Sequence, residues 1–163
     1  IESIARSLLE FSSGEGDGEK EEFAIDEPMK TVIAILEPQY RASGISVFCD
    51  RKEKHVVRVN RVQLQDAFFN MLNYIFAEIQ KNGKIVIECA AKEGALTLYI
   101  RSRDLVVADH IIKDVFEPVS GLYRERRGFG FNLFIAKELI ERNGATLKIS
   151  SDASTGAEFC IKF

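Results

Sequence analysis

The sequence predicts one two-layer α/β (α+β) sandwich, in which about three helices cover one face of a mixed, mostly antiparallel sheet. Two observations predict this fold class. Long segments repeat apolar residues at helical spacing, and short segments between them alternate apolar and polar side chains, as half-buried strands do. The expected order of elements is βαββαββααββ. A chain of 163 residues is long enough to bury the core of such a domain.

Composition and charge exclude several functions. A net charge of −3 gives no general attraction to nucleic acid or anionic membranes. The longest apolar runs are shorter than a membrane span, and we expect no signal peptide and a cytoplasmic location. Cys49, Cys89 and Cys160 are widely spaced in apolar segments, which favours reduced core thiols over a disulfide or a metal site. His55 and His110 have no ligand-like spacing, so we interpret both as structural or solvated.

The first 22 residues are expected to precede the globular domain. Residues 1–11 place Ile1, Ile4, Leu8 and Phe11 on one helical face, and they look like the end of a longer helix. Residues 12–22 are rich in glycine and acidic residues, which is typical of a flexible linker. The domain would then occupy residues 23–163.

The elements of the first half follow from spacing and from turn residues. Asp26 is a candidate N-cap for a helix that ends at Gly44, and Pro38 should kink or shorten that helix. A second helix is expected from residue 59 to about residue 80, before a turn at residues 81–83. The predicted strands are residues 23–25, 45–49 and 55–59.

The second half is predicted to begin with a hairpin. Its strands are residues 84–90 and 95–101, around a turn at residues 92–94. Two helices should follow, a short one at residues 111–116 and a longer one at residues 131–142 that Asn143 and Gly144 stop. The last two strands are expected at residues 146–150 and 157–163.

The helix from residue 59 to residue 79 carries an unusual polar face. Asp66, Asn70, Asn73 and Ala77 lie opposite its apolar stripe. Asparagine is unfavourable inside helices because its side chain competes with the backbone for hydrogen bonds. Two asparagines three residues apart share a face and could serve a ligand, or they could be solvated surface residues.

Four ordered motifs carry a resemblance to a known family. They are the sequences Val-Phe-Glu-Pro at residues 115–118, Gly-Phe-Gly-Phe at 128–131, the helix and turn at 135–152, and Gly-Ala-Glu-Phe at 156–159. Residues 23–163 thereby resemble the ATP-binding domain of sensor histidine kinases, a Bergerat-fold ATPase related to gyrase and MutL. The first eleven residues look like the end of that family's dimerisation helix.

The resemblance implies cofactors and partners. The cofactors would be ATP and Mg²⁺. The partners would be the protein's own dimerisation and phosphoacceptor domain, a response regulator, and a second copy in a full-length homodimer. The acceptor histidine of such kinases lies in the upstream helices. Residues 1–11 contain no histidine, so this chain alone cannot phosphorylate itself.

The motif called the N box departs from the family pattern Asn-Leu-Leu-x-Asn-Ala. Asn70 matches its first asparagine, and the resemblance implies that Asn70 is a magnesium ligand. The second asparagine, which helps to hold magnesium, is replaced by Tyr74. Asn73 lies one residue away, about 100° around the helix. A tyrosine cannot supply the compact oxygen ligand that magnesium prefers.

The first glycine box departs further from the family pattern Asp-x-Gly-x-Gly. Ser102 stands in the place of the aspartate that binds the adenine amino group, while Asp104 and Val106 replace the two glycines. Alternatively, Asp104 is that aspartate, displaced by two residues. The replaced glycines normally let the backbone approach the nucleotide closely. The resemblance therefore places Ser102 and Asp104 in the nucleotide site, with altered chemistry.

The second glycine box keeps its glycines. Gly128 and Gly130 precede a helix N-terminus, an arrangement that binds phosphate. Arg126 and Arg127 stand where the family has Gly-Thr. Arg127 could contact phosphates bidentately, or both arginines could form a solvated basic loop that pairs with local acids.

Two hypotheses of different classes remain. The first is a histidine protein kinase domain that binds Mg-ATP, and the second is a degenerate, pseudokinase-type docking or regulatory module of a phosphorelay. The losses at Tyr74, Ser102 and Val106 favour weakened nucleotide binding. We expect Asn70 to face a cleft between the helices and the lid segment. We also expect Tyr74, Ile75 and Val106 to narrow the space for nucleotide.

Overall fold

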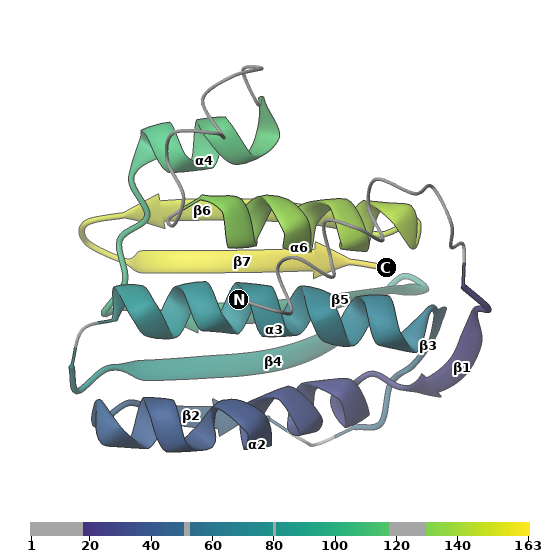
Figure 1. Ribbon diagram of the computed structural model, residues 1–163. Coiled ribbons are helices and arrows are strands. Elements are labelled where there is room, and N and C mark those ends of the chain that lie inside the picture. Colours follow the sequence, from purple (N-terminus) through teal and green to yellow (C-terminus); the bar gives the residue numbers. More distant parts are fainter. Residues whose placement is uncertain (1–17, 51–52, 80, 118–129) are drawn as a thin grey trace.

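The computed structural model describes residues 18–50, 53–79, 81–117 and 130–163. Three helices, α2 (Asp26–Ala42), α3 (Arg61–Glu78) and α6 (Phe131–Arg142), lie side by side on one face of a sheet (Figure 1). A shorter helix, α4 (Asp109–Phe116), stands beyond the sheet on the side of α6. These layers confirm the predicted two-layer sandwich.

The main sheet has five strands in the order β2-β4-β5-β7-β6. Its β2 and β4 strands pair in parallel and the other neighbours are antiparallel, so the sheet is mixed and mostly antiparallel. The β4–β5 turn contains Glu93 and Gly94, both with positive φ, as tight hairpin turns require. The strands are β2 (Ser46–Cys49), β4 (Lys84–Lys92), β5 (Ala95–Ser102), β6 (Thr146–Asp152) and β7 (Gly156–Lys162).

A separate pair of strands, β1 (Glu21–Ala24) and β3 (Val56–Val59), forms a small antiparallel sheet beside the N-terminus of α3. The Arg61 side chain holds this corner together. It pairs with Glu21 at 2.8 Å and with Glu27 at 2.9 Å, and its guanidinium lies 4.6 Å from the centre of the Phe23 ring. The entry of the chain into the domain is thus tied to the first residue of α3.

The core lies between the helix layer and the main sheet. Helix α3 is its central element and packs against both α6 and α2. Phe68 and Phe159, from α3 and β7, are the largest fully buried side chains, and fully burying such a ring stabilises the fold by about 1.5–3 kcal/mol. Alternate residues of β4 and β5 point into this core, which confirms the predicted strand periodicity.

Several local expectations were wrong. Pro38 does not end α2, which continues to Ala42, because its buried face extends to Tyr40 and this ring packs 5.0 Å from Phe76. The residue at the N-cap position is Ile25 rather than Asp26. The strand β1 starts at Glu21, inside the predicted linker of residues 12–22. The structure does not describe residues 1–17, so the predicted terminal helix lies outside the described residues.

Within the described part of the chain, no helix is both long and apolar enough to span a lipid bilayer. The three cysteines are free thiols, and no cluster of three potential metal-ligating side chains occurs among the described residues. Burial raises the pKa of the Cys89 thiol to about 11, so this group is protonated at neutral pH. The prediction of free thiols is confirmed, although all three cysteines are half-buried rather than part of the fully buried core.

Candidate functional site

Asn70 lies on α3 and is only 7% exposed. Its Nδ2 atom donates a hydrogen bond of 2.8 Å to the carbonyl oxygen of Asp66, one turn earlier in the same helix. This bond fixes the side-chain rotamer and leaves Oδ1 as the atom that could ligate a metal. The predicted cleft involves lid residues that lie outside the described part of the chain, so the position of Asn70 beside a lid stays a prediction.

Tyr74 follows Asn70 by one turn and is 3% exposed. Burial, together with the nearby Glu78 carboxylate, raises the pKa of the Tyr74 hydroxyl far above its usual range. The side chain is therefore a neutral phenol at every physiological pH. The position where the resemblance predicts an amide oxygen therefore holds a large buried side chain, and the next residue, Ile75, is completely buried. Asn73 is half-buried and stays a candidate site residue.

Burial of Glu78 also has a consequence for stability. Burial raises the pKa of this carboxyl, so the folded state disfavours its ionised form. The folded state binds the Glu78 proton more tightly than the unfolded state does. The stability of a protonated Glu78 is therefore fully present below the unfolded pKa of this carboxyl, and it is lost as pH rises through the folded-state pKa. We expect Glu78→Gln to stabilise the protein at pH 7 and to have little effect at pH 4. Thermal unfolding at both pH values measures this, with the exposed Glu22→Gln as the control. An equal effect of Glu78→Gln at both pH values would contradict the expectation.

Ser102 ends β5 and is 6% exposed. Its Oγ atom accepts a hydrogen bond of 3.2 Å from the backbone N–H of Asp104, within its own loop. Across the sheet, Ser102 is the register partner of Ala157 on β7. The Ser102 position of the first glycine box therefore lies beside the closing motif, at one end of the β5–β7 pair.

Asp104 has a structural contact of its own. Its Oδ2 atom accepts a hydrogen bond of 2.8 Å from the backbone N–H of Lys84, the first residue of β4. The carboxylate therefore connects the loop after β5 to the start of β4. This contact competes with the alternative in which Asp104 is the displaced adenine-binding aspartate, because one of its two oxygens is already used.

Val106 differs from the expectation. Its neighbours Leu105 and Val107 are each 2% exposed, whereas Val106 itself is 55% exposed. The loop is extended here, and the Val107 N–H donates to Ser151 Oγ at 2.8 Å, so alternate side chains point inward and outward. Tyr74 and Ile75 are buried and Val106 is exposed, so Val106 cannot fill the interior, while the narrowing of a nucleotide space by Tyr74 and Ile75 stays a prediction.

The second glycine box is described only at its end. Arg126, Arg127 and Gly128 lie outside the described residues. Gly130 is the N-cap of α6, and its carbonyl accepts a hydrogen bond from the Phe134 N–H at 3.0 Å. A Cβ atom at Gly130 would come no closer than 3.9 Å to the Ile111 side chain. Among the described residues, packing therefore does not require a glycine at this helix N-terminus.

A buried amide network that sequence reasoning missed joins α3 to α6. The Asn143 side chain, 8% exposed, accepts from the Asn60 N–H at 2.7 Å and donates to Gln63 Oε1 at 2.9 Å and to the Leu139 carbonyl at 2.8 Å. Asn60 is the N-cap of α3, and its Oδ1 accepts from the Gln63 N–H. The sequence signalled only that Asn143 ends a helix.

A charged groove on the opposite face of the sheet was also missed. Its volume is about 1200 Å³, and it is lined by residues of β4, β5, β6 and β7 and by the loops after β5 and between β6 and β7. Arg101 crosses its floor, pairing with Glu158 at 2.6 Å and with Glu88, and its guanidinium lies 4.3 Å from the Tyr99 ring. Ser102 and Asp104 reach its rim, but the groove lies on the face away from α3.

Relatives of the chain were found among curated proteins and solved structures. A scan against protein-family models finds no match. The chain is 22% identical over 173 residues to the sensor protein SrrB of Staphylococcus aureus; the match covers 99% of the chain and 29% of SrrB. Among solved structures, the histidine kinase AdeS of Acinetobacter baumannii superposes with a TM-score of 0.76 at 17% identity, covering 99% of this chain and 75% of AdeS.

The chain has the fold of a histidine kinase catalytic domain. Full-length ShkA, solved in complex with AMPPNP, superposes with a TM-score of 0.78 at 18% identity over 98% of this chain and 35% of ShkA. ThkA, solved in complex with the response regulator protein TrrA, superposes with a TM-score of 0.74 at 20% identity, covering 99% of this chain and 46% of ThkA. The histidine-kinase-type domain thus spans less than a third of the curated relative that it matches.

Proposed function

We propose that this chain is the C-terminal ATP-binding type of domain of a two-component sensor histidine kinase, and that its Mg-ATP binding is weakened. The observation that carries the proposal is the buried Tyr74 beside Asn70. Asn70 keeps one amide oxygen for a metal, while the next turn offers a neutral phenol in place of a second amide. In this proposal Asn70, Asn73, Tyr74, Ser102, Asp104, Arg127, Gly128 and Gly130 form the altered nucleotide site.

The expected loss of affinity follows from the missing contacts. A hydrogen bond to a charged group contributes about 1.5–3 kcal/mol, and about 1.4 kcal/mol changes affinity tenfold. The Ser102 hydroxyl cannot replace a carboxylate at the adenine amino group, and it already accepts from the Asp104 N–H. Adding the absent magnesium ligand and the replaced glycines leads us to expect ATP dissociation constants of about a millimolar or weaker.

The alternative is a docking or regulatory module that binds no nucleotide. ThkA was solved with a response regulator, and this chain superposes on it across almost its whole length, which supports a response regulator as a partner under both proposals. The full-length protein would be a homodimer that also presents its own phosphoacceptor domain to this domain. The two proposals differ in whether any nucleotide enters the site.

Calorimetric titration with ATP and ADP, with and without Mg²⁺, tests the proposal. We expect no magnesium-dependent binding below about a millimolar for the unaltered chain. The double variant Tyr74→Asn with Ser102→Asp should bind at least tenfold more tightly if the site is open but lacks ligands. A micromolar constant that requires magnesium in the unaltered chain would overturn weakened binding, and no gain in the variant would favour the docking module.

A matched control separates the site from general destabilisation. Tyr40→Asn removes another buried tyrosine, 8% exposed, from α2 rather than α3. Both asparagine variants lose a buried ring, so circular dichroism should show comparable destabilisation. Only the α3 variant should change nucleotide affinity, and equal affinity changes in both would show that the effect is not local.

A further inference from the structure

A second cavity lies beneath the first turn of α2, on the side of the sheet that the helices cover. Its volume is about 170 Å³. The cavity forms where β2 ends at Cys49, while the neighbouring β4 continues to Lys92, and the chain leading to β3 lines it in place of β2. Its described lining residues belong to this chain segment, to the start of α2 and to the strands, and none belongs to α3 or α6. The cavity is therefore separate from the altered nucleotide motifs.

The interior of the cavity is apolar and rich in sulfur. Cys49 on β2 is the register partner of Ile87 on β4. Cys89 lies two residues after Ile87 and so on the same face of β4, and both cysteines pack against the core. Met29, which is 3% exposed, adds a third sulfur atom from α2, and Leu98 completes the floor from β5. Burial raises the pKa of the Cys89 thiol to about 11, so this thiol is uncharged at neutral pH.

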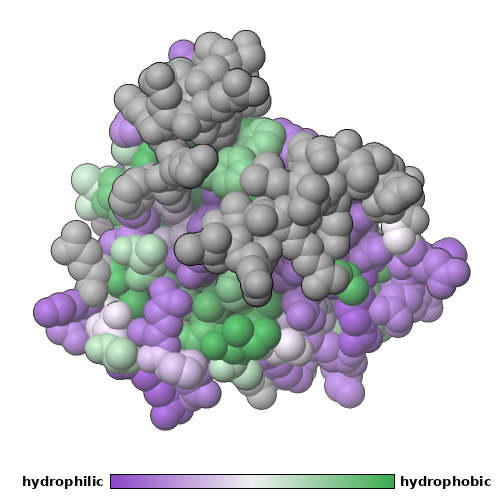
Figure 2. All heavy atoms as spheres, in the orientation of Figure 1, coloured by the Kyte–Doolittle hydropathy of each residue, from purple (hydrophilic) through white to green (hydrophobic). Residues whose placement is uncertain are grey.

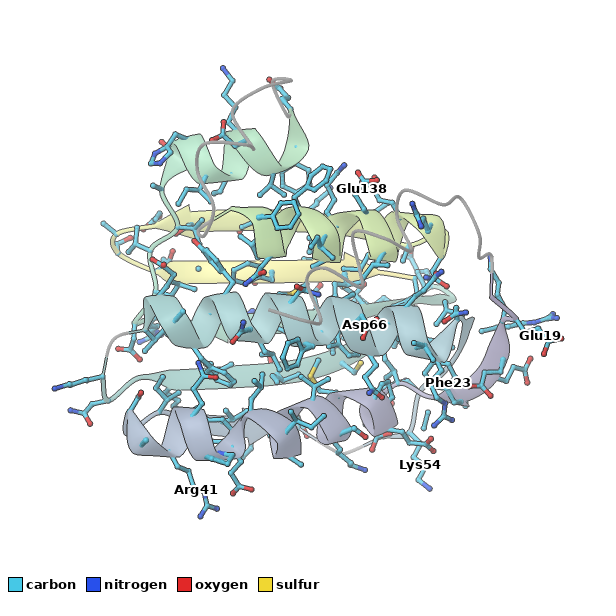
Figure 3. The ribbon with its side chains drawn as sticks, viewed as in Figure 1. Glu19, Phe23, Arg41, Lys54, Asp66 and Glu138 are labelled. Carbon is cyan, nitrogen blue, oxygen red and sulfur yellow. The ribbon has the colours of Figure 1, made fainter. Side chains whose placement is uncertain are left out.

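The mouth of the cavity is hydrophilic. Asp26, in the first turn of α2, forms an ion pair with Lys30. A carboxylate oxygen of Glu53 lies 3.8 Å from the Nε2 atom of His55. Figure 3 shows Lys54 beside the first turn of α2, at the edge of the molecule, and the surface around this turn, at the lower right of Figure 2, is mostly hydrophilic. A ligand would therefore pass a polar entrance before it reaches an apolar interior.

We propose that this cavity binds an uncharged, apolar aromatic compound, between benzene and indole in size. A cavity of about 150 Å³ with aliphatic and aromatic walls binds benzene, so a volume of about 170 Å³ accommodates a ring compound of similar or slightly larger size. Sulfur atoms make favourable contacts with aromatic rings, and Met29, Cys49 and Cys89 bring three of them to one cavity. Apolar walls hold water poorly, and an apolar group that displaces poorly ordered water gains affinity.

Occupancy of the cavity would strengthen the contact between α2 and the sheet. The backbone N–H of Ile25 donates a hydrogen bond of 2.9 Å to the carbonyl oxygen of His55, which joins the start of α2 to the segment before β3. Both residues line the cavity, so a bound ring would contact both sides of this joint. For a ligand of this size we expect a dissociation constant of about 0.1–1 mM.

Thiol alkylation of the 163-residue chain tests the proposal, with indole as the probe. Cys160 on β7 is an internal control. It is half-buried, like the two cysteines of the cavity, but it lies on the other face of the sheet, because Phe159 and Ile161 on either side of it are buried in the core. Indole at about ten times its dissociation constant leaves about a tenth of the cavities empty. Mass spectrometry should therefore show alkylation by N-ethylmaleimide slowed about tenfold at Cys49 and Cys89 and unchanged at Cys160.

Uracil is the matched control ligand, because its ring is similar in size but carries polar groups that the apolar interior cannot satisfy. It should protect none of the three cysteines. Absence of protection by indole, equal protection of all three cysteines, or equal protection by uracil would each overturn the proposal.

Two leucine variants locate the bound ring. Cys89→Leu should fill the cavity and abolish the protection of Cys49, whereas Cys160→Leu, the same substitution on the outer face of the sheet, should leave it unchanged. Circular dichroism checks that both variants fold. If Cys89→Leu does not fold, Cys89→Ala takes its place, since it enlarges the cavity and should keep the protection of Cys49. Protection of Cys49 that survives in a folded Cys89→Leu variant, or that is lost in Cys160→Leu or Cys89→Ala, would overturn the proposal.

Discussion

Gly156→Ala is expected to lower the free energy of unfolding by about 3 kcal/mol or more. Gly156 starts β7 with φ of +83°, and a Cβ atom there would lie 2.1 Å from the Ser102 carbonyl oxygen and 2.5 Å from the Arg103 Cα. These are backbone atoms, which cannot move aside as a flexible side chain can. The variant would either break the β5–β7 pairing at the Ser102–Ala157 position or displace the loop after β5.

Gly94→Ala is the matched control for this substitution. Gly94 has almost the same φ, +80°, but no atom of the described residues lies within 4 Å of the position that an alanine Cβ atom would occupy. The control therefore shows only the cost of a left-handed alanine, about 1–2 kcal/mol. Thermal unfolding should show a melting temperature about 6–12 °C lower for Gly156→Ala and clearly less for Gly94→Ala. Similar losses for both variants would mean that close contact at Gly156 does not determine its identity.

Asn143→Ala is expected to cost about 2–3 kcal/mol. The substitution removes one acceptor and two donated hydrogen bonds, and it leaves the Asn60 N–H without its partner at the junction of α3 and α6. Because Asn60 caps α3, loosening this junction should also loosen the first turn of that helix. Chemical denaturation measures the loss, and amide exchange of residues 60–64 should increase with it.

The control for Asn143 is Gln39→Ala, which truncates an exposed amide on α2. That change should stay within about 0.5 kcal/mol of the unaltered protein. Asn143→Asp provides a second comparison, because a carboxylate keeps the acceptor for the Asn60 N–H but loses both donated bonds. We expect Asn143→Asp to lower the free energy of unfolding at neutral pH. If neither Asn143→Ala nor Asn143→Asp changes the free energy of unfolding, the network does not stabilise the junction.

Periodicity alone predicted most elements of this fold. The apolar spacing in α2, α3 and α6 and the alternation in β4 and β5 report which side of each element faces the core, and such patterns depend only on local geometry. The order of the elements then led to the two-layer sandwich. The error at Pro38 arose because α2 keeps burying one face as far as Tyr40, and this tertiary packing, which includes Phe76, is not visible in a local pattern.

The candidate site could be predicted from the sequence less completely than the fold, because its properties depend on tertiary structure. Aligned motifs predicted Asn70, Tyr74 and Ser102 as candidate residues, but their burial comes from packing between elements that are distant in sequence. The sequence could not distinguish the exposed Val106 from the buried Val107, because the loop is held by Ser151 of another strand.

By itself, the sequence determined the fold class, the elements and the residue types at the altered nucleotide motifs, because local spacing and turn chemistry decide these features. Only the tertiary structure decided that Tyr74 is a buried neutral phenol, that Ser102 faces Ala157 across the sheet, and that Asn143 caps the meeting of two helices. Burial and hydrogen bonding between segments up to 83 residues apart produce these properties, and no local pattern encodes them.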